Sequence, residues 1–203
     1  HECRYNWKTF IEVYLEDYHV EPFHPGLGQF VTCNDLRWQF APWASVQSVG
    51  VNSGLAKAGT RTYERWHKAV LDYYRGQTPP HGAIWLTYYP NIMVEWYPHV
   101  LVISTLIPQA VDRTLNVVEF YYPEEVHAFE RQIVEAHQAA YAESATEDAE
   151  ACSRLHRGRR ARPVPRAHPA RAGGRARAGG AAVSARAGGQ GRRRPRGDRA
   201  GAP

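Results

Sequence analysis

Residues 84–125 read IWLTYYPNIMVEWYPHVLVISTLIPQAVDRTLNVVEFYYPEE, and this stretch decides the fold class of the 203-residue chain. It contains four runs of β-branched and aromatic residues, a composition typical of strands, at 84–89, 92–97, 100–107 and 115–122. Only a few residues separate these runs, and such short connections join antiparallel neighbours. The stretch therefore predicts a four-stranded antiparallel meander.

A long helix is expected directly after the strands. Pro123 fits the first helical position, and Glu124 and Glu125 fit the first turn, where acidic side chains interact favourably with the helix dipole. The following residues are rich in Ala, Glu and Gln, so one helix should continue to about Arg157. Strands followed by a long helix predict an α+β domain, with the helix laid across a curved antiparallel sheet.

The segments before residue 84 predict a further helix and further strands. Residues 35–51 favour two short strands around Pro42, and residues 62–75 favour a helix that ends at a Gly- and Pro-rich break. Residues 6–25 read NWKTFIEVYLEDYHVEPFHP and predict a helix capped by Asn6. The apolar residues of that helix follow one helical stripe, which we expect to be buried: Trp7, Phe10, Ile11, Tyr14, Leu15 and Tyr18.

Two histidines at the end of this helix indicate a metal site. Glu16 and His19 share a face because they are three residues apart, and His24 follows His19 by five. Pro22 should end or kink the helix between them, which would allow His24 to turn back towards His19. Two imidazoles beside carboxylates are most of a two-histidine, one-carboxylate iron site. The alternative for each histidine is a structural place in the core.

The whole string resembles the catalytic-domain signature of the Rieske non-haem iron oxygenases, the large (alpha) subunits of aromatic-ring-hydroxylating systems. The matching residues are Asn6, Trp7, Lys8, Glu12, Glu16, His19 and His24. The resemblance covers residues 4–161 and is specific at its two ends. It implies a helix-grip (Bet v 1/START-like) fold and mononuclear Fe(II) bound by His19 and His24. It also places the third ligand on the C-terminal helix, where Asp148 matches and Glu147 is the competitor one residue away.

The resemblance also implies an activity. Fe(II) and O₂ would hydroxylate, or oxidatively demethylate, an aromatic or other hydrophobic organic substrate. Glu16 would orient His19 and connect it to the electron supply from a neighbouring subunit, while Val13, Tyr14 and Phe23 would line the substrate pocket. The alternative function is a non-catalytic helix-grip protein that binds a hydrophobic ligand in the same cavity.

The electron supply expected for this family is missing from the chain. A Rieske [2Fe-2S] cluster needs a Cys-x-His and a Cys-x-x-His pair, and none of Cys3, Cys33 and Cys152 has a histidine at that spacing. We therefore expect the N-terminal Rieske domain to be absent and the cluster to belong to the full-length protein, itself a homotrimer. Electrons would come from NAD(P)H through a separate reductase or ferredoxin, so that this chain alone should be inactive.

Composition divides the chain at residue 161. Residues 162–203 consist almost wholly of Arg, Ala, Gly and Pro, and we expect them to form a disordered tail. Eleven Arg and one Asp give this tail a charge of +10, and because the whole chain carries +5, residues 1–161 carry −5. The tail lacks the aromatics of RNA-binding Arg-Gly segments, so a nucleic-acid partner is not expected. GC-only codons encode the same four residue types, which favours an out-of-frame tail over a genuine basic arm.

Cysteine use and hydropathy indicate the compartment. The three cysteines have no CxxC spacing and fit a reducing cytoplasm. No apolar run approaches the roughly 18 residues that a membrane span needs. We therefore expect a cytoplasmic catalytic domain at residues 1–161, without membrane contact.

Overall fold

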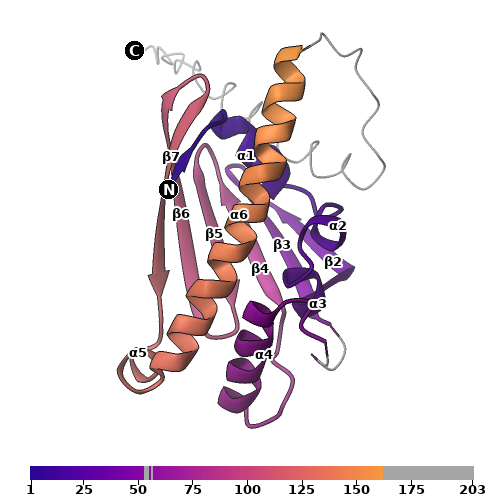
Figure 1. Cartoon of the computed structure of the whole chain (residues 1–203), viewed down its shortest axis with the longest axis vertical. Coiled ribbons are helices and arrows are strands. Elements are labelled where there is room, and N and C mark those ends of the chain that lie inside the picture. The colour runs from indigo at the N-terminus through magenta and orange to yellow at the C-terminus, as the bar shows by residue number, and fades with distance from the viewer. Residues whose placement is uncertain (53–54, 56, 162–203) are drawn as a thin grey trace, which may run out of the picture.

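A single antiparallel sheet and one long helix organise the molecule (Figure 1). The computed structural model describes residues 1–52, 55 and 57–161, so the predictions for the tail at 162–203 lie outside the described residues. The 31-residue helix α6 (Arg131–Ala161) crosses one face of a seven-stranded sheet, with α4 (Arg61–Tyr73) beside it. The predicted α+β fold, a curved antiparallel sheet with a long C-terminal helix, is confirmed.

The sheet is larger than the predicted four-stranded meander. Its order is β1-β7-β6-β5-β4-β3-β2, so β2 to β7 are consecutive antiparallel neighbours. The bounds are β1 (Glu2–Cys3), β2 (Val31–Phe40), β3 (Ala44–Val51), β4 (Ala83–Tyr88), β5 (Ile92–Tyr97), β6 (Val100–Ala110) and β7 (Arg113–Tyr121). The four predicted runs are β4 to β7, and the two short strands expected around Pro42 are β2 and β3. The meander therefore has six strands, and β1 adds a seventh at the edge.

The core lies between the sheet and helices α4 and α6. Thr60 caps α4 by accepting a hydrogen bond from the backbone N–H of Tyr63 at 3.2 Å. Four helical positions of α4 at spacings of three and four then face inward: Tyr63, Trp66, His67 and Val70. Trp66 is 1% exposed and packs against Phe30, Tyr97 and His137. Three members of this aromatic cluster, Trp66, Tyr97 and His137, also line the cavity described below.

The C-terminal helix is interrupted where the sequence predicted continuity. Pro123 occupies the cap position, α5 (Glu124–Phe129) follows it, and Glu130 leaves helical geometry with φ −119° and ψ 50°. The helix resumes at Arg131, the start of α6. No Gly or Pro marks this break, which is why composition predicted a single helix.

The N-terminal helix is shorter than predicted. Helix α1 (Trp7–Tyr14) begins at the Asn6 cap as expected, but it ends before Glu16. The expected buried stripe is wrong, because the buried positions of α1 are Thr9 and Val13, while Tyr18 lies beyond the helix and is 57% exposed. Val13 packs into a small cluster with Cys3, Tyr5 and Cys152, and this contact sets the buried face of α1. None of the helices among the described residues is both long and apolar enough to cross a membrane.

Candidate metal centre

A single helical turn brings the two histidines together. Helix α2 (Val20–Phe23) lies between His19 and His24, and helix α3 (Leu27–Phe30) follows. The backbone N–H groups of Phe23 and His24 donate to the carbonyls of His19 and Val20 at 2.9 Å each. This turn places the two imidazole centroids 5.1 Å apart. Pro22 lies inside the first turn of α2, where its missing N–H removes no helical hydrogen bond, so it does not end the helix as expected.

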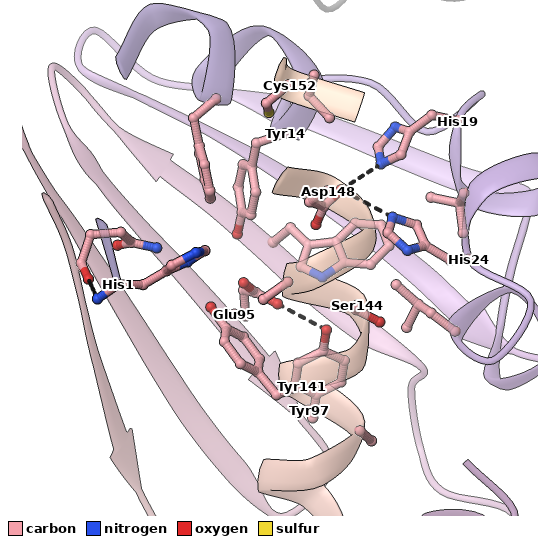
Figure 2. Close-up of a pocket in the computed structure, with 18 of the residues that line it drawn as sticks. His1, Tyr14, His19, His24, Glu95, Tyr97, Tyr141, Ser144, Asp148 and Cys152 are labelled. Atoms are coloured by element: carbon pink, nitrogen blue, oxygen red, sulfur yellow. Dashed lines mark hydrogen bonds and ion pairs between the residues drawn. The ribbon is translucent and has the colours of Figure 1, made fainter. Parts of the chain in front are cut away.

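Asp148 completes the cluster from α6, 124 residues after His24 in sequence. Its Oδ1 lies 3.1 Å from His24 Nε2 and 3.4 Å from His19 Nε2, and all three donor atoms lie within 4.8 Å of one another (Figure 2). Metal bonds of about 2.1 Å at right angles would place adjacent donor atoms about 3 Å apart. The two distances to Asp148 are close to this value, and the donor set of two imidazoles and one carboxylate is that of two-histidine, one-carboxylate metal sites.

A second carboxylate stands behind each histidine. Glu16 Oε1 lies 2.6 Å from His19 Nδ1, and Glu16 Oε2 accepts a hydrogen bond from the His19 backbone N–H at 3.2 Å. His19 Nδ1 itself makes no hydrogen bond of good geometry, so the contact with Glu16 is an ion-pair contact. Glu147 Oε2 lies 2.7 Å from His24 Nδ1. Each ring thus faces Asp148 through Nε2 and a glutamate through Nδ1, an arrangement that fixes ring orientation.

This geometry separates the two carboxylates that the sequence left in competition. Asp148 contacts both histidines on the side where their Nε2 atoms converge. Glu147 contacts only His24, and does so through the opposite ring nitrogen. The structure therefore brings together His19, His24 and Asp148, and it gives Glu147 an orienting position that the sequence did not indicate.

The charges of the cluster are strongly coupled. Burial alone would lower the pKa of His19, but the Asp148 and Glu16 carboxylates raise it to about 9. The pKa of His24 is also raised, because Asp148 and Glu147 outweigh burial. Burial would raise the pKa of Asp148, but the two imidazoles lower it to about 2. In the metal-free chain, protons on the histidines therefore balance the carboxylates where a metal cation would otherwise do so.

A cavity of about 70 Å³ opens beside the cluster (Figure 2). A water molecule needs about 10–15 Å³ of such volume, so the cavity has room for about five to seven waters, or for a small organic molecule of similar size. Val13 and Tyr14 line the cavity, as expected, but Phe23 does not and is 41% exposed. Tyr14 is held in place because its hydroxyl donates to the Val94 carbonyl at 3.2 Å and its own carbonyl accepts from Gln47 at 3.1 Å.

Most of the cavity wall was not identified from the sequence. Aromatic rings from α4, β4, β5 and α6 form much of it: Tyr63, Trp66, Trp85, Tyr97 and Tyr141. These residues have the same signature as ordinary core residues, so periodicity could not separate them. Glu95 was the one residue whose type could have indicated a cavity from the sequence. It is acidic, yet it occupies the inward row of β5 between the apolar Met93 and Tyr97.

Solved structures resemble this chain in fold. A quaternary ammonium Rieske monooxygenase in complex with an inhibitor gives a TM-score of 0.59 at 19% identity, covering 80% of this chain and 39% of that one. Dicamba monooxygenase bound to 3,6-dichlorosalicylic acid gives 0.58 at 12% identity, covering 92% and 58%. At these identities the likeness concerns the fold alone.

Two proteins of known name are much more similar to this chain in sequence than the solved structures are. A protein named putrescine 2-hydroxylase from Bordetella bronchiseptica is 62% identical over 161 residues, and one of the same name from Ralstonia nicotianae is 64% identical over 161 residues. These matches cover 79% of this chain but only 37% and 44% of the two relatives, so the chain spans less than half of their length. The family described as ring hydroxylating alpha subunit (catalytic domain) matches residues 1–180. With the fold and this match in agreement, the chain belongs to the Rieske oxygenase alpha subunits and carries their catalytic domain.

Proposed function

We propose that His19, His24 and Asp148 bind mononuclear Fe(II), and that this domain hydroxylates a small aliphatic amine with O₂. The observation that carries the proposal is the convergence of two imidazole nitrogens and one carboxylate oxygen in the wall of a cavity. When bound there, Fe(II) would supply the activation of O₂.

An amine substrate replaces the aromatic one expected from the sequence. The two relatives at more than 60% identity are named for putrescine, a four-carbon diamine, and these names support hydroxylation but not an aromatic substrate. The small cavity volume also favours a short aliphatic molecule over a fused-ring aromatic. Oxidative demethylation and dioxygenation have no comparable support.

The protein groups have separable tasks in this proposal. Glu16 and Glu147 orient the two imidazoles, so that both Nε2 atoms point at one position. The aromatic wall excludes water from the space next to the metal ligands. Glu16, through its contact with His19, is also the residue through which we propose that electrons pass from the donor towards the metal. The [2Fe-2S] cluster, the trimer and the NAD(P)H-dependent reductase would belong to the rest of such an enzyme.

Grafting the domain tests the function. This chain would replace the matching segment of the Bordetella relative, and the hybrid would be supplied with reductase, NAD(P)H, O₂ and putrescine. We expect mass spectrometry to detect one added oxygen on the diamine, and we expect the His19→Ala hybrid to form none. A hybrid that holds iron and consumes NAD(P)H without oxygenating putrescine would contradict the substrate proposal. A chain that binds amine but no iron would instead fit the non-catalytic ligand-binding alternative.

A further inference from the structure

An acidic side chain lies inside the cavity, away from the metal cluster. Glu95 belongs to the inward row of β5 with Met93 and Tyr97, and it is 9% exposed. Its Oε2 accepts a hydrogen bond from the Tyr97 hydroxyl at 2.8 Å. In the register of the sheet, Trp85 on β4 and Val102 on β6 flank it. Figure 2 shows Glu95 among the lining residues, apart from His19 and His24.

Glu95 has no cationic partner in the part of the chain that the structure describes. Among the described residues no Lys, Arg or His forms an ion pair with its carboxylate, and the charge of His24, itself paired with Asp148 and Glu147, acts on Glu95 only from beyond ion-pair distance. A carboxylate buried without a cation is costly, and proteins normally pair such a group or leave it at a site where a ligand supplies the opposite charge. Because Glu95 lines the cavity, a cationic ligand bound there could supply the missing positive charge.

The surroundings of Glu95 suit a cation on an alkyl chain. Three tyrosines from other elements line the same cavity and interact electrostatically with Glu95: Tyr14 from α1, Tyr63 from α4 and Tyr141 from α6. The faces of aromatic rings attract ammonium groups, and the same rings provide apolar contact for methylene groups. An anionic ligand would be repelled by Glu95, whereas Asp148 is already paired with His19 and His24, so Glu95 is the group that distinguishes a cation from an anion at its end of the cavity.

Helix α6 gives an approximate span between the part of the cavity near Glu95 and the metal cluster. Tyr141 and Asp148 lie on one face of α6, seven residues apart, which is about 10 Å along a helix. Tyr141 interacts electrostatically with Glu95, while Asp148 contacts both histidines. A molecule with one end at Glu95 and its carbon chain directed at the cluster would need only a few carbon atoms.

We propose that Glu95 anchors one ammonium group of the substrate and thereby makes the cavity selective for amines. This inference rests on the proposed function, since it identifies the residue that holds the amine while the carbon chain faces His19, His24 and Asp148. Glu95 acts as a binding and specificity residue, with Tyr97 holding its carboxylate in place.

Binding to the iron-free chain tests this role without any turnover. Isothermal titration, at a pH above 7, would compare 1,4-diaminobutane with butane-1,4-diol, which has the same backbone and no charge. We expect the wild-type chain to bind the diamine at least about thirtyfold more tightly than the diol, since a buried charge pair contributes that much or more. In Glu95→Gln, the diamine affinity should fall to that of the diol, and the diol affinity should stay unchanged.

Glu119→Gln is the matched control. Glu119 also accepts a hydrogen bond from a tyrosine two residues later, Tyr121 at 3.2 Å, but it lies on the exposed face of β7. This variant should bind the diamine as the wild type does. The inference is overturned if Glu95→Gln binds the diamine normally, or if the wild-type chain binds diol and diamine equally, a comparison that needs no variant.

Iron content separates this inference from the proposed function. If the chain takes up Fe(II) through His19 but shows no preference for the diamine, the Glu95 inference fails and the metal site stands. If binding of the diamine depends on Glu95 but the chain takes up no iron, the proposed function fails and the amine site stands.

Discussion

The replacement of Glu95 by Gln should stabilise the iron-free chain at neutral and alkaline pH. Burial, with the charge of Asp148, raises the pKa of Glu95 from 4.5 to about 7, against the opposing hydrogen bond from Tyr97 and the charge of His24. An acid whose folded-state pKa is raised binds its proton more tightly in the folded state. The free energy of unfolding therefore falls as pH rises from 4.5 to about 7, and the loss persists above that range. At 1.36 kcal/mol for each pKa unit, the loss is about 3 kcal/mol.

Glutamine removes this penalty and keeps most of the local structure. Its amide oxygen can still accept the hydrogen bond from Tyr97, and its volume is close to that of glutamate. Three tyrosines that interact electrostatically with Glu95, namely Tyr14, Tyr63 and Tyr141, have raised pKa values because they are buried, and they stay neutral over the relevant range. The metal cluster is the same in both proteins. The difference in stability between the two proteins therefore reports the titration of Glu95.

Urea unfolding of the two proteins provides the measurement. At about pH 5 the two free energies of unfolding should lie close together, and at about pH 8 Glu95→Gln should be more stable by up to about 3 kcal/mol. Glu119→Gln should match the wild type at both pH values, because that carboxylate is exposed. A difference between Glu95→Gln and wild type that does not change with pH would refute the reasoning.

Three further predictions concern the metal centre and the core. The apparent affinity for Fe(II) should fall as pH is lowered from 9, because the proton held by His19 competes with the metal. Iron titrations at several pH values would measure this, and an affinity that does not change with pH would contradict it. Glu147→Gln should still bind one iron per chain, but its Fe(II) affinity in the same titrations should be about 10–100-fold weaker, because His24 loses the carboxylate that orients its ring. An unchanged affinity would show that Glu147 does not have this role. Trp66→Ala should destabilise the chain by about 3–5 kcal/mol in urea unfolding, because it empties the centre of the aromatic cluster, and a much smaller loss would place the core elsewhere.

Sequence patterns predicted the elements whose signals are local. The strands β4 to β7 follow from their β-branched and aromatic runs, and His19 and His24 follow from their spacing beside Glu16. The end of α1 at Tyr14 and the break at Glu130 carried no Gly or Pro signal, so the predicted N-terminal helix was too long and the C-terminal helix was predicted as one piece instead of two.

The resemblance to a family placed the distant third ligand at Asp148, but the residue pattern alone could not separate Asp148 from Glu147. The choice between Glu147 and Asp148 depends on which side of α6 faces α2, and one residue of helix rotates a side chain by about 100°. The role of Glu95 depends on the sheet register and on the helices that enclose it, because an acidic residue in a strand is ordinarily an exposed one. Its alternation with Met93 and Tyr97 indicates that Glu95 points inward, but only the folded structure shows that it points into a cavity.

The most direct test of the central claim is the amount of Fe(II) bound after anaerobic reconstitution. The comparison needs wild type, His19→Ala, Asp148→Ala and the control Glu150→Ala, whose side chain lies on the exposed face of α6 and pairs with Arg154. We predict one iron per chain in wild type and in Glu150→Ala, and little or none after loss of His19 or Asp148. Equal iron in wild type and Asp148→Ala, or none in a folded wild-type chain, would contradict the assignment of this cluster as the iron site.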